Sequence, residues 1–157
     1  MISIPAIISY LDFLNKAFFT IKVSRSDIRG KKIFEVGEKH YFNDTGIRNA
    51  IVGFNPGDMG LILENMVFNH LISTGFRVFT GKSGDREIDF IAERRGERKY
   101  IQATLTLGDQ KTMDREFGNL LAIKDQYPKI VVSMEKSPAP NTYLGIQNLS
   151  LLEFLME

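Results

Sequence analysis

The stretch FRVFTGKSGDREIDFIAERRGERKYIQATLTL, residues 76–107, decides the fold of this chain. It contains three runs rich in β-branched and aromatic residues, FRVFT, REIDFIA and KYIQATLTL, which are typical of strands. The segments GKSGD and ERRGER separate these runs and are typical of turns. We therefore predict three consecutive strands.

A helix is predicted immediately before these strands, over residues 58–74. Asp58 can cap its start, and Gly75 can end it in the left-handed conformation. The residues of its apolar stripe recur at helical spacing and are Leu63, Val67 and Leu71.

A second helix is predicted after the strands, over residues 109–125. Its inward positions are Met113, Phe117, Leu120 and Leu121. The run KIVVSM (129–134) predicts a short buried strand, and YLGIQNL (143–149) a last strand leading into the terminal LLEFL. The order helix, three strands, helix, two strands predicts an α/β sandwich with a central mixed sheet.

The first part of the chain predicts a smaller unit. Residues 5–15 have helical periodicity with Ser3 as a cap, and AFFTIKVSR and KKIFEV flank the turn SDIRG as a β-hairpin. A helix followed by a hairpin is the closing half of a winged helix. We predict three segments: a partial winged helix over 1–37, a connector over 38–57, and the main α/β domain over 58–157.

Composition excludes several classes of site. The chain has 157 residues, a net charge of +1 and no cysteine. Disulfides, thiolate zinc sites and cysteine nucleophiles are therefore excluded, and the near-neutral charge gives no global attraction to nucleic acid or membranes. The two histidines, His40 and His70, are not spaced as a metal motif. The start lacks the pattern of a signal peptide and no apolar run is long enough to span a bilayer, so we expect a cytoplasmic protein without membrane contact.

Strand alternation groups the polar residues of the central strands. Ile88, Phe90 and Ala92 are expected on one face, and Asp89 on the opposite face. In the next strand Gln102 and Thr104 share a face, opposite Ile101, Ala103, Leu105 and Leu107. On the preceding helix, Glu64 lies beside the apolar stripe.

An acid on a helix, an acid on a strand and a polar-x-polar pair on the following strand resemble the site of the PD-(D/E)XK nuclease superfamily, which has a restriction-endonuclease-like fold. The matching residues are Glu64, Asp89 and the pair Gln102 and Thr104. The resemblance implies that Glu64, Asp89 and Gln102 bind Mg²⁺, which activates the attacking water.

This sequence departs from the superfamily at two positions. Thr104 stands where the superfamily has its lysine, and Gln102 replaces the second acid, so we expect weak Mg²⁺ binding and doubtful catalysis. Lys82 and Lys99 are the candidates for a substitute lysine. In the alternative interpretation Glu64 pairs with Arg86, and Asp89 belongs to a buried polar cluster.

A longer resemblance covers nearly the whole chain. Stretches including YLDFLNKAFF, KHYFNDTGIRNAIVG, LENMVFNHLISTGFRVFTGKSGDREIDFIA and TMDREFGNLLAIKDQYPKIVVS resemble the domain of unknown function that follows the ATPase module in many bacterial and archaeal AAA-type ATPases. This resemblance implies a winged helix followed by a nuclease-like domain, and an ATPase module as partner in a longer chain.

The ATPase motor itself is not expected in this chain. The GKS at residues 81–83 lacks the glycine that a P-loop has five positions earlier, and a strand follows it where a P-loop opens a helix. No nucleotide site is therefore expected.

The predicted hairpin is basic, and its candidates for contact with a DNA backbone are Arg25, Arg29, Lys31 and Lys32.

Three functional hypotheses follow. The first is an accessory module that binds DNA through a degenerate nuclease site. The second is an active Mg²⁺-dependent nuclease in which Lys82 or Lys99 replaces the missing lysine. The third is a protein-interaction module that controls assembly or target choice of the ATPase, and an oligomer is compatible with each.

Arg115 and Glu116, which follow Thr112, are expected either to support the site or to form an exposed ion pair within the helix.

Overall fold

The computed structural model describes residues 2–28, 33–83, 86–134 and 141–157. Its elements in chain order are α1 (Ile4–Lys16), β1 (Thr20–Asp27), β2 (Ile33–Phe42), α2 (Thr45–Val52), the 3-10 helix η1 (Pro56–Asp58), α3 (Met59–Ser73), β3 (Arg77–Ser83), β4 (Arg86–Arg94), β5 (Glu97–Thr104), α4 (Gln110–Leu121), β6 (Lys129–Ser133), β7 (Thr142–Tyr143), β8 (Ile146–Ser150) and α5 (Leu151–Leu155).

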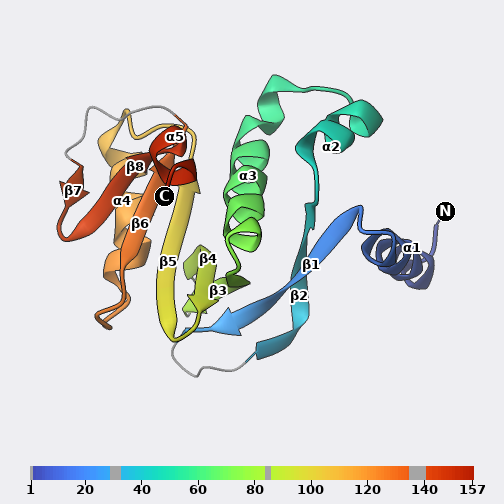
Figure 1. Cartoon of the computed structure of the whole chain (residues 1–157), viewed down its shortest axis with the longest axis horizontal. Helices are drawn as coiled ribbons and strands as arrows, with labels where there is room; N and C mark the ends of the chain where they lie inside the picture. Colours follow the sequence, from blue (N-terminus) through green and yellow to red (C-terminus); the bar gives the residue numbers. More distant parts are fainter. Residues whose placement is uncertain (1, 29–32, 84–85, 135–140) are drawn as a thin grey trace.

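The strands form one mixed sheet of eight strands in the order β2-β1-β3-β4-β5-β6-β8-β7 (Figure 1). β3, β4 and β5 are antiparallel neighbours, as expected for strands that follow one another so closely in the sequence. β1 pairs with β3 in parallel, and β5, β6 and β8 are parallel to one another. The prediction of an α/β fold with a mixed sheet is confirmed.

Helices pack on both faces of the sheet. The face covered by α3 has a core around Phe68, Phe90 and Ile101. The face covered by α4 has a core around Tyr100 and Phe117. Successive residues of β5 enter different cores, because side chains alternate across a strand.

The predicted helix over residues 58–74 is confirmed as α3, and it ends as expected. Gly75 follows it with φ +85°, a conformation that glycine adopts without a steric penalty. Asp58 does not cap the helix with its side chain, contrary to the prediction. Its carboxylate is paired with the guanidinium of Arg48 in α2.

The predicted β-hairpin is present as β1 and β2, but it continues the main sheet. Backbone pairing joins Arg25 of β1 to Thr80 of β3. The boundary predicted between residues 37 and 38 falls inside β2, which runs to Phe42. The expected connector over 38–57 therefore contains half a strand and the helix α2. Breaker residues in this region lie between these elements, where Asp44 caps α2.

One predicted side-chain face is wrong. Ile88 packs in the core under α4, whereas Phe90 and Ala92 pack in the core under α3. The cause is an irregularity in the pairing of β3 with β4, where Phe79 is opposite Ile91 but Gly81 is opposite Ile88. An extra residue in one strand reverses the alternation beyond it.

The ends of two other elements also differ from the predictions. β5 stops at Thr104, and Leu107 therefore packs in the core under α4 and not beside Ile101. The terminal LLEFL forms the short helix α5, which a capping box between Ser150 and Glu153 starts. None of the helices in the described part of the chain has the length and apolar character needed to cross a membrane.

Candidate functional site

A cavity of about 680 Å³ opens beside the irregular part of β4. It brings together the four residues that sequence analysis grouped, Glu64, Asp89, Gln102 and Thr104. The other residues that line it are Gly60, Arg86, Glu87, Ala103, Leu105, Thr106, Thr112, Arg115, Glu116 and Asn119. The helices α3 and α4 and the strands β4 and β5 thus all contribute to one polar cavity.

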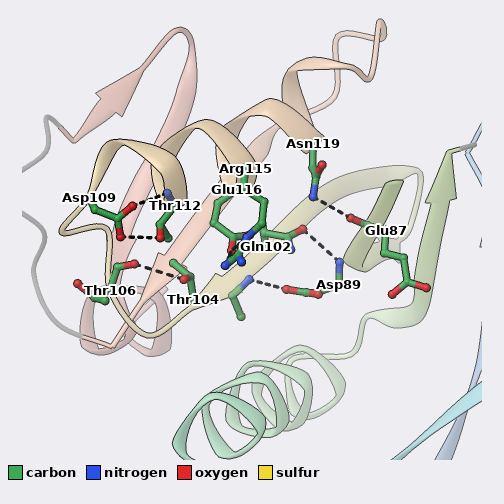
Figure 2. A network of polar contacts seen from close by, with 11 residues as sticks. Glu87, Asp89, Gln102, Thr104, Thr106, Asp109, Thr112, Arg115, Glu116 and Asn119 are labelled. Atoms are coloured by element: carbon green, nitrogen blue, oxygen red, sulfur yellow. Dashed lines mark hydrogen bonds and ion pairs between the residues drawn. The ribbon is translucent and has the colours of Figure 1, made fainter. Parts of the chain in front are cut away.

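Asp89 is positioned where β4 and β5 separate. The regular pairing of these strands runs as far as Phe90 and Ile101. Beyond that point the Ala103 amide donates to Oδ2 of Asp89 at 2.8 Å, and the Asp89 amide donates to Oε1 of Gln102 at 3.4 Å (Figure 2). Side chains therefore satisfy the backbone groups that the sheet leaves free.

The Asp89 carboxyl has an unusual electrostatic environment. Its pKa is raised to about 7, mainly by burial and then by the negative charge of Glu64. Glu116 adds to this effect, while the Ala103 hydrogen bond and the charge of Lys39 lower the pKa in part. The favourable contacts of the Asp89 carboxylate do not offset its burial and the nearby negative charges. Binding of a cation or a proton would therefore stabilise it near neutral pH.

Glu64 is held by the hairpin. Its Oε1 accepts hydrogen bonds from Lys39 Nζ at 2.9 Å and from Tyr41 Oη at 2.5 Å, both in β2. Burial and the neighbouring Glu64 carboxylate raise the pKa of Tyr41 well above its usual range, so Tyr41 stays a donor. The alternative in which Glu64 pairs with Arg86 is wrong, since Arg86 donates to the Gly118 carbonyl at 2.8 Å.

Gln102 and Thr104 are both 8% exposed and share the face of β5 opposite Ile101, as predicted. The Thr104 hydroxyl donates to the Thr106 carbonyl at 3.3 Å. Neither proposed substitute lysine lines this cavity. Lys82 lies in β3 opposite Glu87, and Lys99 lies over the ring of Phe76 on the α3 side.

Glu116 was predicted either to support the site or to form an exposed ion pair, and the structure places it in the cavity lining; its role as a candidate ligand was not predicted. It projects from α4 into the site, is 4% exposed, and accepts two hydrogen bonds from Arg115 on Oε1, at 2.9 and 2.5 Å (Figure 2). Its Oε2 is buried and has no hydrogen-bond partner among the described residues. The signal was available in the spacing, because Glu116 lies three residues after Met113 and four before Leu120, which were both predicted to face inward.

The fit to the implied Mg²⁺ is partial. Within the described ranges, no three His, Asp or Glu side chains form a group that could hold a metal ion. Glu64 Oε1 is already engaged by Lys39 and Tyr41, and Gln102 offers only a neutral oxygen. The carboxylates of Asp89 and Glu116 remain as donors. A Mg²⁺ ion that also binds a phosphate usually takes only one or two carboxylate ligands from the protein.

The predicted basic surface of the hairpin is described only at Arg25. Its guanidinium pairs with Glu87 at 2.9 Å, and the Arg25 side chain is 21% exposed. The other three candidates, Arg29, Lys31 and Lys32, lie outside the described residues. The cations that line the cavity itself are Arg86 and Arg115.

The chain is similar in sequence to a known protein of Haemophilus influenzae. An uncharacterized protein of Haemophilus influenzae (strain ATCC 51907 / DSM 11121 / KW20 / Rd) is 37% identical over 148 residues, which is 94% of this chain and 36% of that protein. The chain thus spans about a third of the length of the relative that it matches. No family model matches the chain, and no solved structure matches it.

Proposed function

We propose that this chain is an accessory module of an AAA-type ATPase, with a nuclease-like fold whose cavity binds nucleic acid without cleaving it. The observation that carries the proposal is the convergence of Glu64, Asp89, Gln102 and Thr104 on one cavity, with Arg86 and Arg115 in its lining. Guanidinium groups bind phosphate oxygens, and the four residues occupy the elements in which nuclease-like proteins carry their site.

The absence of a lysine from the cavity lining, within the described part of the chain, supports binding without cleavage. Thr104 has no titratable amine, and Lys82 and Lys99 do not line the cavity. Lys39 is the lysine whose contact reaches the site, but its ammonium is engaged with Glu64 at 2.9 Å. An active Mg²⁺-dependent nuclease would need Lys39 to leave that ion pair.

A link to an ATPase accords with the length of the Haemophilus influenzae relative. This chain matches 36% of that protein, and the remaining part leaves room for a further module. The ATPase partner rests on the sequence resemblance, because the name of the relative states no activity.

Fluorescence anisotropy with duplex and branched DNA tests the proposal. We expect binding that weakens between about 50 and 200 mM salt, because phosphate contacts release counterions. Arg86→Gln should weaken binding several-fold, and Lys124→Ala, a change at an exposed cation that does not line the cavity, should leave it unchanged. Absence of binding at low salt would refute the proposal.

A second candidate function is protein interaction, and the exposed apolar surface of α1 favours it. Ile4 is 74% exposed, Phe13 61% and Phe18 78%, which is unusual for large apolar side chains gathered on one helix and its end. Sedimentation velocity with the ATPase module of the same protein tests this function. Complex formation that Phe13→Glu abolishes would support it, and sedimentation as two separate species would refute it.

A further inference from the structure

We propose that Glu116 and Asp89 together bind one divalent cation, with Glu116 supplying the carboxylate that is absent at Gln102. The pair comes from two elements, since Asp89 lies in β4 and Glu116 in α4, and both residues line the cavity (Figure 2). The role of the cation rests on the proposed function, because a cation held here would offer positive charge to the phosphates of a bound nucleic acid.

The unpartnered oxygen of Glu116 is the first observation that points to a ligand. The residue is 4% exposed, and Oε2 has no hydrogen-bond partner among the described residues. A buried carboxylate oxygen without a donor is unfavourable, because it loses hydration and gains nothing in return. Arg115 does not resolve this, since both of its hydrogen bonds go to Oε1. A cation bound beside Oε2 would supply the missing partner of this oxygen.

The arrangement of Asp89 is the second observation. Its Oδ2 is fixed by the Ala103 amide at 2.8 Å, which leaves Oδ1 as the oxygen available to the cavity. The Gln102 side chain accepts from the Asp89 amide, so β5 holds both the backbone and the carboxylate of Asp89. Carboxylate oxygens held in place are the donors that Mg²⁺ and Mn²⁺ prefer.

Glu64 is not a ligand in this proposal. Its Oε1 accepts from both Lys39 and Tyr41, and Lys39 already balances its charge. The site therefore differs from the set of Glu64, Asp89 and Gln102 that the nuclease resemblance implies. Replacing single carboxylates separates the two sets.

A Mn²⁺ titration of the full chain, followed by the electron paramagnetic resonance signal of the free ion, tests the inference without nucleic acid. We expect one Mn²⁺ per chain, an affinity at least about tenfold lower in Glu116→Gln and in Asp89→Asn, and wild-type affinity in Asp114→Asn, an exposed change on the same helix. Wild-type affinity in Glu116→Gln would overturn the inference, as would the absence of Mn²⁺ binding. Loss of binding in Glu64→Gln, with Glu116→Gln unaffected, would assign the cation to the other set.

A second measurement needs no variant and covers the case in which a replacement unfolds the chain. Mn²⁺ broadens amide resonances of the wild-type protein close to the ion. We expect the strongest broadening at Ala103 and Glu116, and broadening centred elsewhere would overturn the inference. Since neither measurement includes DNA, a chain that binds Mn²⁺ but no nucleic acid would refute the proposed function alone, and the reverse result would refute the cation site alone.

Discussion

Replacing Asp89 with asparagine should stabilise the protein at about pH 8 and have a smaller effect at about pH 5. The Asp89 pKa is raised from 3.8 to about 7, so the folded protein holds this proton more tightly than the unfolded chain does. The resulting stabilisation is complete below the unfolded pKa and is lost as pH rises through about 7. Asparagine is neutral throughout and keeps an oxygen that can accept from the Ala103 amide.

The size of the effect follows from the shift. Each pKa unit corresponds to about 1.4 kcal/mol, so the whole shift amounts to about 4 kcal/mol between its low-pH and high-pH limits. The interval from pH 8 to pH 5 covers roughly two thirds of this, and water in the open cavity screens part of the charge. We therefore expect the gain in unfolding free energy from Asp89→Asn to be about 1–2 kcal/mol larger at pH 8 than at pH 5.

Urea unfolding of the metal-free protein at the two pH values measures this difference. Asp114→Asn is the control, because Asp114 is an exposed carboxylate on α4 outside the cavity lining. Its variant should show no comparable change between the two pH values. A loss of stability in Asp89→Asn that is equal at both pH values would contradict the reasoning, since it would mean that the Asp89 carboxylate is favourable as an anion.

Other changes test the packing and the buried hydroxyls. Gly81→Ala should destabilise the protein by about 1–3 kcal/mol in urea unfolding, because an added Cβ would lie 2.9 Å from Ile88 Cβ. Gly118→Ala is the matched control: no atom lies within 4 Å of its added Cβ, so it should stabilise the protein by about 0.5–1 kcal/mol. Equal effects of the two substitutions on the unfolding free energy would contradict this reasoning. Tyr100→Phe should remove a phenol that titrates near pH 12 in ultraviolet absorbance, where burial and the bond to Asp125 hold its pKa, and should destabilise by about 1–3 kcal/mol. An unchanged titration curve would refute that assignment.

Periodicity predicted the central part of the fold because that part obeys simple rules. The strands around residues 76–107 are separated by short glycine-containing stretches of sequence, and the predicted apolar stripe of α3, Leu63, Val67 and Leu71, is buried. The joining of β1 to β3 was not predictable in this way, since no local pattern specifies a parallel partner far along the chain. The N-terminal hairpin was therefore assigned to a separate unit.

The candidate site was predictable in its membership and less so in its contacts. Asp89 was placed on the correct strand, but the irregular pairing beside Gly81 reverses the neighbouring Ile88, and alternation alone contains no sign of that change. The partners of Glu64, Lys39 and Tyr41, come from the second half of β2, which was predicted to belong to the connector over 38–57. Glu116 had a readable signal in helical spacing, but its unpartnered oxygen is visible only in the structure.

The parallel pairing of β1 with β3 has a consequence for the order in which the protein folds. β3, β4 and β5 follow one another closely in the sequence and can associate early, whereas Arg25 meets Thr80, 55 positions later (80 − 25), only after the intervening chain has closed into a loop. Closing such a loop has an entropic penalty that grows with the logarithm of its length, and contacts of this kind form late. The hairpin carries Lys39, so the ion pair that holds Glu64 in the cavity wall should be among the last native contacts to form and among the first to open.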